Sequence, residues 1–135
     1  MSEIVLFDTS VLIDQIRTNR HLNRIRQVKG LVRQSSVVLA ELWRGASSRI
    51  DRKAIEALET GNPTLTPTDN NWLESGHLLA EIREDKGFEP EKLRDLHFDV
   101  LIALTARSYG ARLIASNRAD FELIRKYLDF RLEVW

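Results

Sequence analysis

Short apolar runs and longer amphipathic stretches alternate along this 135-residue chain. Residues 3–7 and 112–116 are brief and mostly apolar, which is the pattern of buried strands. Weaker runs of the same kind predict three further strands, at 30–34, 64–66 and 131–134. The segments between them carry helical periodicity or helix start and stop signals. These signals predict helices at residues 10–18, from there to about 28, and at 36–45, 50–60, 69–86, 90–108 and 117–127.

The predicted order of elements is β-α-α-β-α-α-β-α-α-β-α-β, and this order indicates the class of fold. Strands that are separated by helices pair in parallel, and the helices cover the sheet. We therefore expect a three-layer α/β fold with a central parallel sheet of about four to five strands. The chain has the length of one domain, so residues 1–135 are expected to form a single domain.

Asp8 follows the first apolar run and directly precedes a predicted helix. An acid in this place lies at the carboxyl end of a parallel sheet, where ligands and metals bind in α/β proteins. The alternative is that Asp8 only caps the helix that begins near Ser10. On this segment alone the two interpretations are equally good.

Glu41 is the second unusual acid, because it lies on an apolar stripe of its predicted helix. Its helical neighbours three and four residues away include Val37, Val38 and Gly45. Burial of an unpaired carboxylate costs several kcal/mol, so Glu41 needs a cation. That cation is either Arg44, three residues further on, or a metal ion.

Asp99 and Asp120 each have a capping explanation as well. Asp99 precedes the apolar segment 100–106, but helical signals already begin near Pro90, which places Asp99 inside a continuing helix or at a break in it. Asp120 stands three residues after Asn117, as in a capping box. However, this pair follows the second clear strand as Asp8 follows the first, so both could face one edge of the sheet.

Four converging carboxylates would repel one another unless a cation lies among them. The chain has no cysteine, so a metal would be held by oxygen or histidine, and oxygen ligands favour Mg²⁺ or Mn²⁺. His21, His77 and His97 are scattered and are expected to have packing or surface roles. An oxygen-bound metal of this kind suits phosphodiester hydrolysis. Asp14 either approaches the acids or pairs with Arg17.

Hydrophobic residues make up 43% and charged residues 30% of the chain, which is ordinary for a folded globular protein. No apolar tract reaches the roughly 18 residues of a membrane span, and the amino terminus lacks a secretory signal pattern. We therefore expect a cytoplasmic protein that does not enter a membrane.

The formal net charge is zero, but the charges are divided unevenly. Residues 1–53 contain ten Lys/Arg and five Asp/Glu, whereas residues 54–135 contain ten and fifteen. The basic run through residues 17–33 could neutralise phosphates of a nucleic acid, or it could be a solvated helix face. None of Trp43, Trp72 and Trp135 is interleaved with this run, so a base-stacking platform is not predicted.

Each of the four acids lies in a longer stretch: Phe7–Asp14, Val38–Ala46, Phe98–Ala103 and Ala115–Phe121. Together these stretches resemble the PIN domain family, and more narrowly the VapC-type toxins of bacterial and archaeal toxin–antitoxin pairs. They occur in the family's order and spacing over essentially the whole chain. One departure is Ser10, where many members carry asparagine, although serine still offers a hydroxyl.

The resemblance implies a PIN-like fold and an endoribonuclease that depends on Mg²⁺ or Mn²⁺. It implies a homodimer, an antitoxin whose tail blocks the pocket, and transfer or ribosomal RNA as the substrate. Two alternatives stay open: a PIN-type nuclease of RNA maturation or decay without an antitoxin, and a non-catalytic module that binds a partner's arginines. The implied acidic pocket consists of Asp8, Glu41, Asp99 and Asp120, with Asp8 and Asp99 as the first metal ligands and Thr9, Ser10, Arg44, Ser116 and Asn117 around them.

Overall fold

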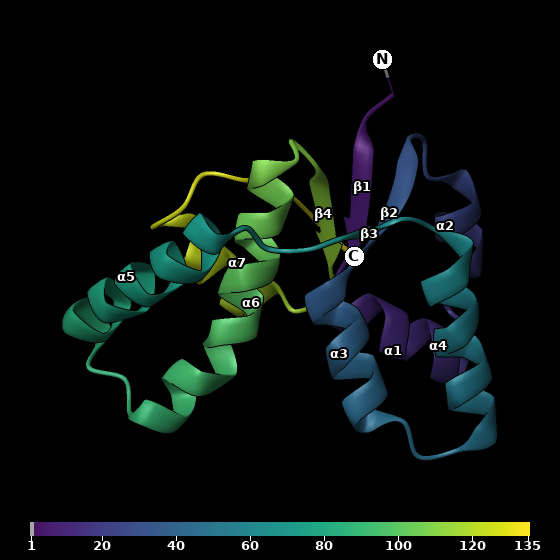
Figure 1. Ribbon diagram of the computed structural model, residues 1–135, viewed down its shortest axis with the longest axis horizontal. Coiled ribbons are helices and arrows are strands. Elements are labelled where there is room, and N and C mark those ends of the chain that lie inside the picture. Colours follow the sequence, from purple (N-terminus) through teal and green to yellow (C-terminus); the bar gives the residue numbers. More distant parts are fainter. Residues whose placement is uncertain (1) are drawn as a thin grey trace.

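A computed structural model describes residues 2–135 and contains a five-stranded sheet in which all strands are parallel (Figure 1). The strand order is β3-β2-β1-β4-β5, so the first strand lies at the centre. This arrangement confirms the predicted α/β class and the parallel sheet. The strands are β1 (Ile4–Phe7), β2 (Leu31–Ser35), β3 (Thr64–Leu65), β4 (Arg112–Ala115) and β5 (Arg131–Val134).

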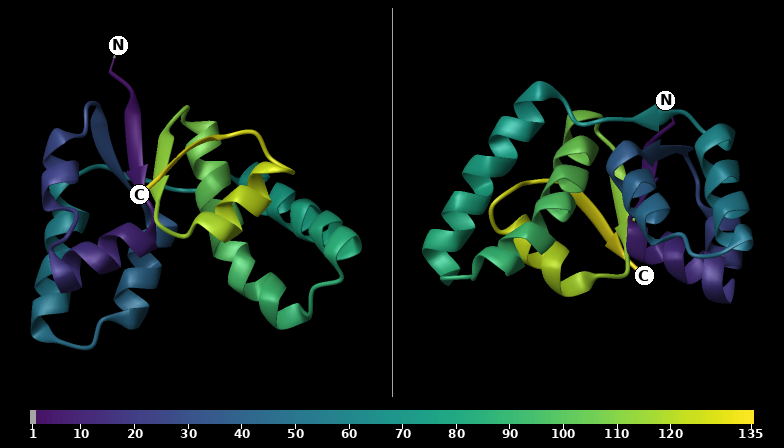
Figure 2. Two further views of the ribbon diagram at one scale, coloured as in Figure 1. Left: turned by 180° about the vertical axis from the view of Figure 1, so that it is seen from behind. Right: turned by 60° about the horizontal axis from the view of Figure 1, so that its bottom comes forward.

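Helices lie on both sides of this sheet. Helices α1, α2 and α4 lie on one side, and α5, α6 and α7 lie on the other (Figures 1 and 2). Helix α3 packs against α1 and α4 and also against α6, so it joins the two helical layers. The helices are α1 (Thr9–Thr18), α2 (Leu22–Gln27), α3 (Ser36–Gly45), α4 (Arg49–Gly61), α5 (Asp69–Lys86), α6 (Pro90–Ser108) and α7 (Arg118–Arg125).

Local sequence signals account for the ends of these helices. Helix α5 begins with a capping box, in which Thr68 and Asn71 exchange hydrogen bonds, and it ends at Gly87, whose φ of 65° is in the left-handed region. Proline occupies the start of α6, where its missing N–H costs nothing. The apolar segment 100–106 of α6 is completely buried, as its composition predicts.

Gly30 precedes β2 and lies very close to the backbone before β1, and this close approach requires glycine. Its φ is +131°, and a Cβ atom built there would lie 2.5 Å from the carbonyl oxygen of Glu3. That carbonyl accepts a hydrogen bond of 2.7 Å from the backbone N–H of Leu31. Only glycine fits this conformation without displacing β1.

The register brings the carboxyl ends of the strands to one edge of the sheet. Phe7 of β1 pairs with Ile114 of β4, and the backbone N–H of Asp8 donates to the Ile114 carbonyl at 2.8 Å. The residues that follow these strands therefore lie close together, as expected for a doubly covered parallel sheet. Within residues 2–135, no helix combines the length and the apolar content that a membrane span needs.

Candidate functional site

The Asp8 carboxylate lies at the carboxyl end of the central strand and is only 3% exposed. Its Oδ2 accepts hydrogen bonds from the backbone N–H of Ser10 at 3.2 Å and from the Ser10 hydroxyl at 2.6 Å. Asp8 is thus the N-cap of α1, as one of the two interpretations predicted. Its Oδ1 is buried and has no hydrogen-bond partner, so capping explains only half of the carboxylate.

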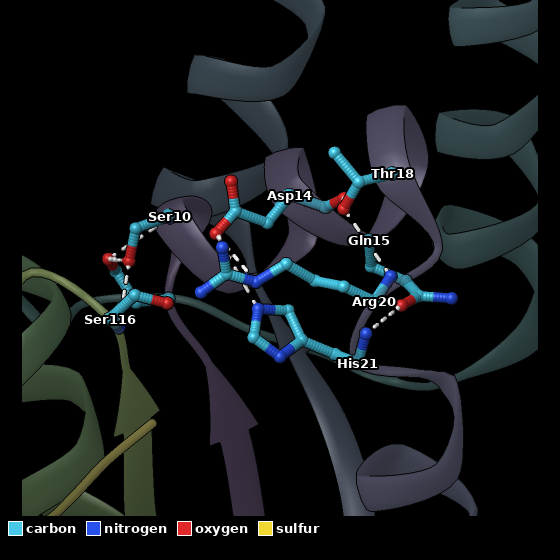
Figure 3. Close-up of polar contacts among 8 residues, drawn as sticks. Ser10, Asp14, Gln15, Thr18, Arg20, His21 and Ser116 are labelled. Atoms are coloured by element: carbon cyan, nitrogen blue, oxygen red, sulfur yellow. Dashed lines mark hydrogen bonds and ion pairs between the residues drawn. The ribbon is translucent and has the colours of Figure 1, made fainter.

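Ser10 links the ends of two neighbouring strands, as Figure 3 shows. Its hydroxyl accepts a hydrogen bond of 3.1 Å from the backbone N–H of Ser116 while it donates to Asp8. The Ser116 hydroxyl is buried and has no hydrogen-bond partner. Two unpaired oxygens, on Asp8 and Ser116, therefore lie beside this link.

Glu41 in α3 is held by a hydroxyl more than by a positive charge. Its Oε1 accepts a hydrogen bond of 2.8 Å from Thr9 of α1, whereas Arg44 lies 3.9 Å from its Oε2 and is 70% exposed. Burial raises the pKa of Glu41, and the Asp8 charge raises it further, while Thr9 and Arg44 lower it. The ion pair with Arg44 exists, but it is too solvent-exposed to balance this charge fully.

Asp99 lies in the interior of α6, so it is not an N-cap. Burial is the largest cause that raises its pKa, which reaches about 8, and the charges of Asp8, Glu41 and Asp120 raise it as well. Lys92 opposes this shift. The four predicted acids are therefore brought close enough together for the charges of the other three to raise the pKa of Asp99.

Asp120 does not form the predicted capping box with Asn117. Asn117 makes no side-chain cap; its amide instead donates a hydrogen bond of 3.1 Å to Asp120 Oδ2. Asp120 Oδ1 accepts one of 3.0 Å from the ammonium of Lys92. Lys92 was not among the predicted site residues, although it precedes Asp99 by seven residues and so shares its helix face.

The donor chemistry of this acidic pocket fits a hard divalent cation. The carboxylates supply only oxygen, burial and the charges of neighbouring acids raise the pKa values of Asp8 and Asp99, and Asp8 keeps one buried oxygen unpaired. Within residues 2–135, however, no three acidic or histidine side chains are gathered closely enough to hold a metal in their present positions. Thr9 and Lys92 hold the side chains of Glu41 and Asp120 instead.

Asp14 pairs with residues other than the one predicted. Its Oδ2 lies 3.8 Å from Arg20 and 3.5 Å from the buried imidazole of His21, so of the two alternatives for Asp14 the pair with Arg17 is wrong (Figure 3). The His21 ring packs 5.5 Å from that of Trp135. The guanidinium of Arg24 lies 5.6 Å above the same indole, so one tryptophan does meet the basic run. The sequence could not reveal this contact because the two residues are at opposite ends of the chain.

Fold and site together describe an α/β protein with an acidic pocket at the carboxyl edge of a parallel sheet. The family model described as "PIN domain" matches residues 5–127, so the chain belongs to the PIN domain family. No curated protein matches the chain.

Solved structures of related fold were also found. A chain of VapBC2 from Rickettsia felis, solved with a DNA fragment from the promoter, is similar with a TM-score of 0.75 and 22% identity, covering 98% of each chain. VapBC-5 from Mycobacterium tuberculosis gives a TM-score of 0.62 at 23% identity, over 97% of this chain and 96% of that one. VapC20 from the same species, described as a sarcin-ricin loop cleaving toxin, gives a TM-score of 0.66 at 17% identity, over 89% of this chain and 94% of that one. These likenesses show the fold.

Proposed function

We propose that the protein is a metal-dependent endoribonuclease, the toxin component of a toxin–antitoxin pair, and that residues 1–135 act as one domain. The observation that carries this proposal is the convergence of four carboxylates at the carboxyl edge of the sheet. Membership of the PIN family and the toxin described in one structural neighbour support the same activity. RNA phosphodiesters are the proposed substrate, with transfer or ribosomal RNA as the class.

Asp8 and Asp99 are proposed to hold a Mg²⁺ or Mn²⁺ ion, with Glu41 and Asp120 completing the acidic pocket. When bound, such an ion lowers the pKa of a water molecule and stabilises the negative charge that builds on the phosphodiester. Asp8 offers its unpaired Oδ1, and Ser10 holds the other oxygen so that the carboxylate keeps its orientation.

The remaining site residues orient these acids and the substrate. Thr9 fixes Glu41 by its hydroxyl, and Asn117 fixes Asp120 by its amide. The Ser116 hydroxyl, which is buried without a partner, is proposed to bind a water molecule or a substrate phosphate beside the pocket. At neutral pH Asp99 retains its proton in the metal-free protein, so binding of a cation must release that proton.

The proposal includes two protein partners. An antitoxin is supported by structural neighbours of the same fold, two of which are described as VapBC systems and one as a toxin–antitoxin complex. The family resemblance also favours a homodimer. Size measurement of the purified chain alone, and after mixing with the product of an adjacent small gene, would test both.

The replacement Asp8→Asn tests the mechanism. Asparagine keeps an oxygen that can cap α1 but removes the charge, so RNA cleavage with Mg²⁺ or Mn²⁺ should fall by about 100-fold or more, since even residues behind metal ligands contribute 10–100-fold. The circular dichroism spectrum should not change. Asp129→Asn, on an exposed acid, is the matched control and should cleave normally. Wild-type cleavage by Asp8→Asn, or undiminished cleavage in excess chelator, would contradict the proposal.

A further inference from the structure

A cleft of about 450 Å³ opens directly beside the acidic pocket. Glu41 belongs to both, so whatever occupies the cleft lies next to the bond that the acids would cut. Helices α3 and α6 form its walls. The residues that line it are Glu41, Arg44, Arg94, Asp95, His97 and Phe98.

Two arginines in this cleft are available to a ligand. Arg44 is 70% exposed, and its single ion pair, to Glu41, is as long as 3.9 Å. Arg94 is exposed and makes no ion pair within 4.0 Å in the part of the chain that the structure describes. Guanidinium groups that lack close carboxylate partners are well suited to bind phosphate.

Two aromatic rings, those of His97 and Phe98, also line the same cleft. The guanidinium carbon of Arg44 lies 5.5 Å from the ring centre of Phe98. Beside it, His97 contacts Ser75 at 3.0 Å and meets Trp72 edge-on at 6.2 Å between ring centres. Burial lowers the pKa of His97, so this ring is neutral near pH 7. Trp72 is 51% exposed, which is unusual for so large an apolar side chain.

The aromatic surface continues beyond the cleft. A second hollow of about 190 Å³ shares Phe98 with it and is also lined by Trp72, Ser36 and Thr66. Adjacent arginines and partly exposed aromatic rings are the combination that binds single-stranded nucleic acid, because bases stack on the rings while the cations contact the backbone.

We propose that this arginine–aromatic cleft binds the nucleotide that flanks the scissile phosphate, with Arg44 and Arg94 on its backbone phosphate and Phe98 against its base. The inference rests on the proposed ribonuclease function and adds a substrate subsite to it. The cleft selects single-stranded RNA at the cutting position, because a paired base cannot turn its face to the Phe98 ring.

A second basic cleft is a weaker candidate for this role. It measures about 520 Å³ and is lined by Arg24, Lys29, Arg112 and Trp135 among others. Arg112 is already bound by Glu3 and Glu133, and the Trp135 indole packs against the rings of Phe7 and His21 as well as against Arg24. None of the four acids lines this second cleft, so its occupant would not lie beside the bond that they would cut.

RNA binding without cleavage tests the subsite. A short fluorescent single-stranded RNA is titrated in excess chelator, from about 50 to about 200 mM salt, with wild type, Arg94→Ala and Phe98→Leu. Arg94→Ala should weaken binding and reduce the slope of log affinity against log salt by about 0.7, the value for one phosphate contact on a single strand. Phe98→Leu should weaken binding about 5-fold or more with the slope unchanged, because it removes stacking but no charge. Arg52→Ala, on an exposed arginine of α4, should bind as wild type does.

The outcomes separate this inference from the proposed function. If Arg94→Ala and Phe98→Leu bind RNA with the same affinity as the control Arg52→Ala, the subsite is overturned. It is also overturned if Arg24→Ala, in the second basic cleft, loses RNA binding while these two variants do not. A polyglutamate peptide is titrated in the same way as a second probe. If Arg94→Ala and Phe98→Leu weaken binding of this peptide but leave RNA binding unchanged, the cleft binds a protein segment, and the subsite is also overturned. Wild type that binds RNA through the cleft but never cleaves it with metal would leave the subsite standing and contradict the nuclease. Arg94 is exposed, so its replacement tests the inference even if Phe98→Leu unfolds.

Discussion

Ser10 is the residue on which the geometry of the acidic pocket most depends. Its hydroxyl donates to Asp8 and accepts from the Ser116 backbone, so one side chain ties β1 to β4 at their carboxyl ends. Ser10→Ala leaves the partly buried N–H of Ser116 unpaired, which should reduce the free energy of unfolding by about 1–3 kcal/mol. Chemical denaturation measures this loss. Ser10→Thr keeps a hydroxyl and should lose much less; equal losses in both variants would contradict the role of the hydrogen bonds.

Asp99 should make the metal-free protein less stable as the pH rises. Its pKa is about 8 in the folded protein against an ordinary value of 3.8, so between these values the folded chain holds more protons than the unfolded chain. The stabilisation is complete below the lower value and is lost as the pH rises through the higher one. The melting temperature in chelator should therefore fall from about pH 5 to about pH 8.5. Asp99→Asn should reduce this fall, and an unchanged fall would contradict the assignment.

Added Mg²⁺ or Mn²⁺ should reverse that trend. Carboxylates must lose their protons before they bind a metal, so the increase in melting temperature on addition of metal should be larger at about pH 8.5 than at about pH 5. Burial also raises the pKa of Asp8 and that of Glu41, which acts in the same direction. Thermal melts of the wild type with and without metal provide the measurement. A metal effect that is equal at both values would contradict the role of these acids.

The sequence singled out the four acids and several residues around them, but it did not show which side chain contacts which, and it missed Lys92. The acids stand out because each has an unusual local context, such as the apolar stripe around Glu41. Their contacts join distant segments: Thr9 and Glu41 are 32 residues apart, and Lys92 and Asp120 are 28 apart. Local patterns carry no information about such pairs. The same limit applies to Asp14, which contacts Arg20 and His21 after the end of α1 and does not pair with Arg17 on its own helix.

At the scale of elements, the hydrophobic pattern predicted every helix and strand of the described chain, with small errors at the ends. The helix predicted to reach about Tyr127 ends at Arg125. The helix predicted to follow directly on Thr18 ends close to the expected Val28, but it begins only at Leu22, after a gap that separates it from α1. Between these two helices Asn19 adopts a φ of 57°, which separates them. Ends depend on caps and tertiary contacts, whereas the interior of an element follows its periodicity.

Two glycines should respond in opposite directions to replacement by alanine. Gly30→Ala forces a side chain into a left-handed conformation and against the Glu3 carbonyl, so it should destabilise the protein by about 1–3 kcal/mol or more. Gly76 lies within α5 with open space around it, and Gly76→Ala should stabilise by about 1 kcal/mol because alanine favours the helix. Melting temperatures of the two variants measure this difference. If both variants change the melting temperature by the same amount, the close contact between Gly30 and the Glu3 carbonyl does not require glycine.

At the scale of the whole molecule, the protein should unfold as one cooperative unit. The two helical layers share one sheet, and α3 contacts helices of both layers. The three tryptophans lie in α3, in α5 and after β5, so their fluorescence samples both layers. Thermal transitions measured by tryptophan fluorescence and by far-ultraviolet circular dichroism should coincide. Two separate transitions would show that the layers melt independently.

The order of the strands was beyond prediction from the sequence, although their number and direction were not. Periodicity predicts that a strand exists and that helical connections make it parallel. It does not say that β1 lies between β2 and β4, and this placement is what brings Ser10 next to Ser116. The acidic pocket depends on that order, because Asp8 follows the central strand and therefore lies between elements from both halves of the chain.

The ion pair between Lys92 and Asp120 has a consequence for how the protein is made. Lys92 places a counter-ion of the chain itself 3.0 Å from Asp120, so part of the acidic charge is balanced internally, and we expect folding to proceed without an external cation. Zinc fingers differ, since their fold forms only with the metal. If the protein has the proposed function, newly synthesised chains would assemble the pocket first, and a divalent cation would then compete with an ammonium group of the chain itself for the carboxylate of Asp120.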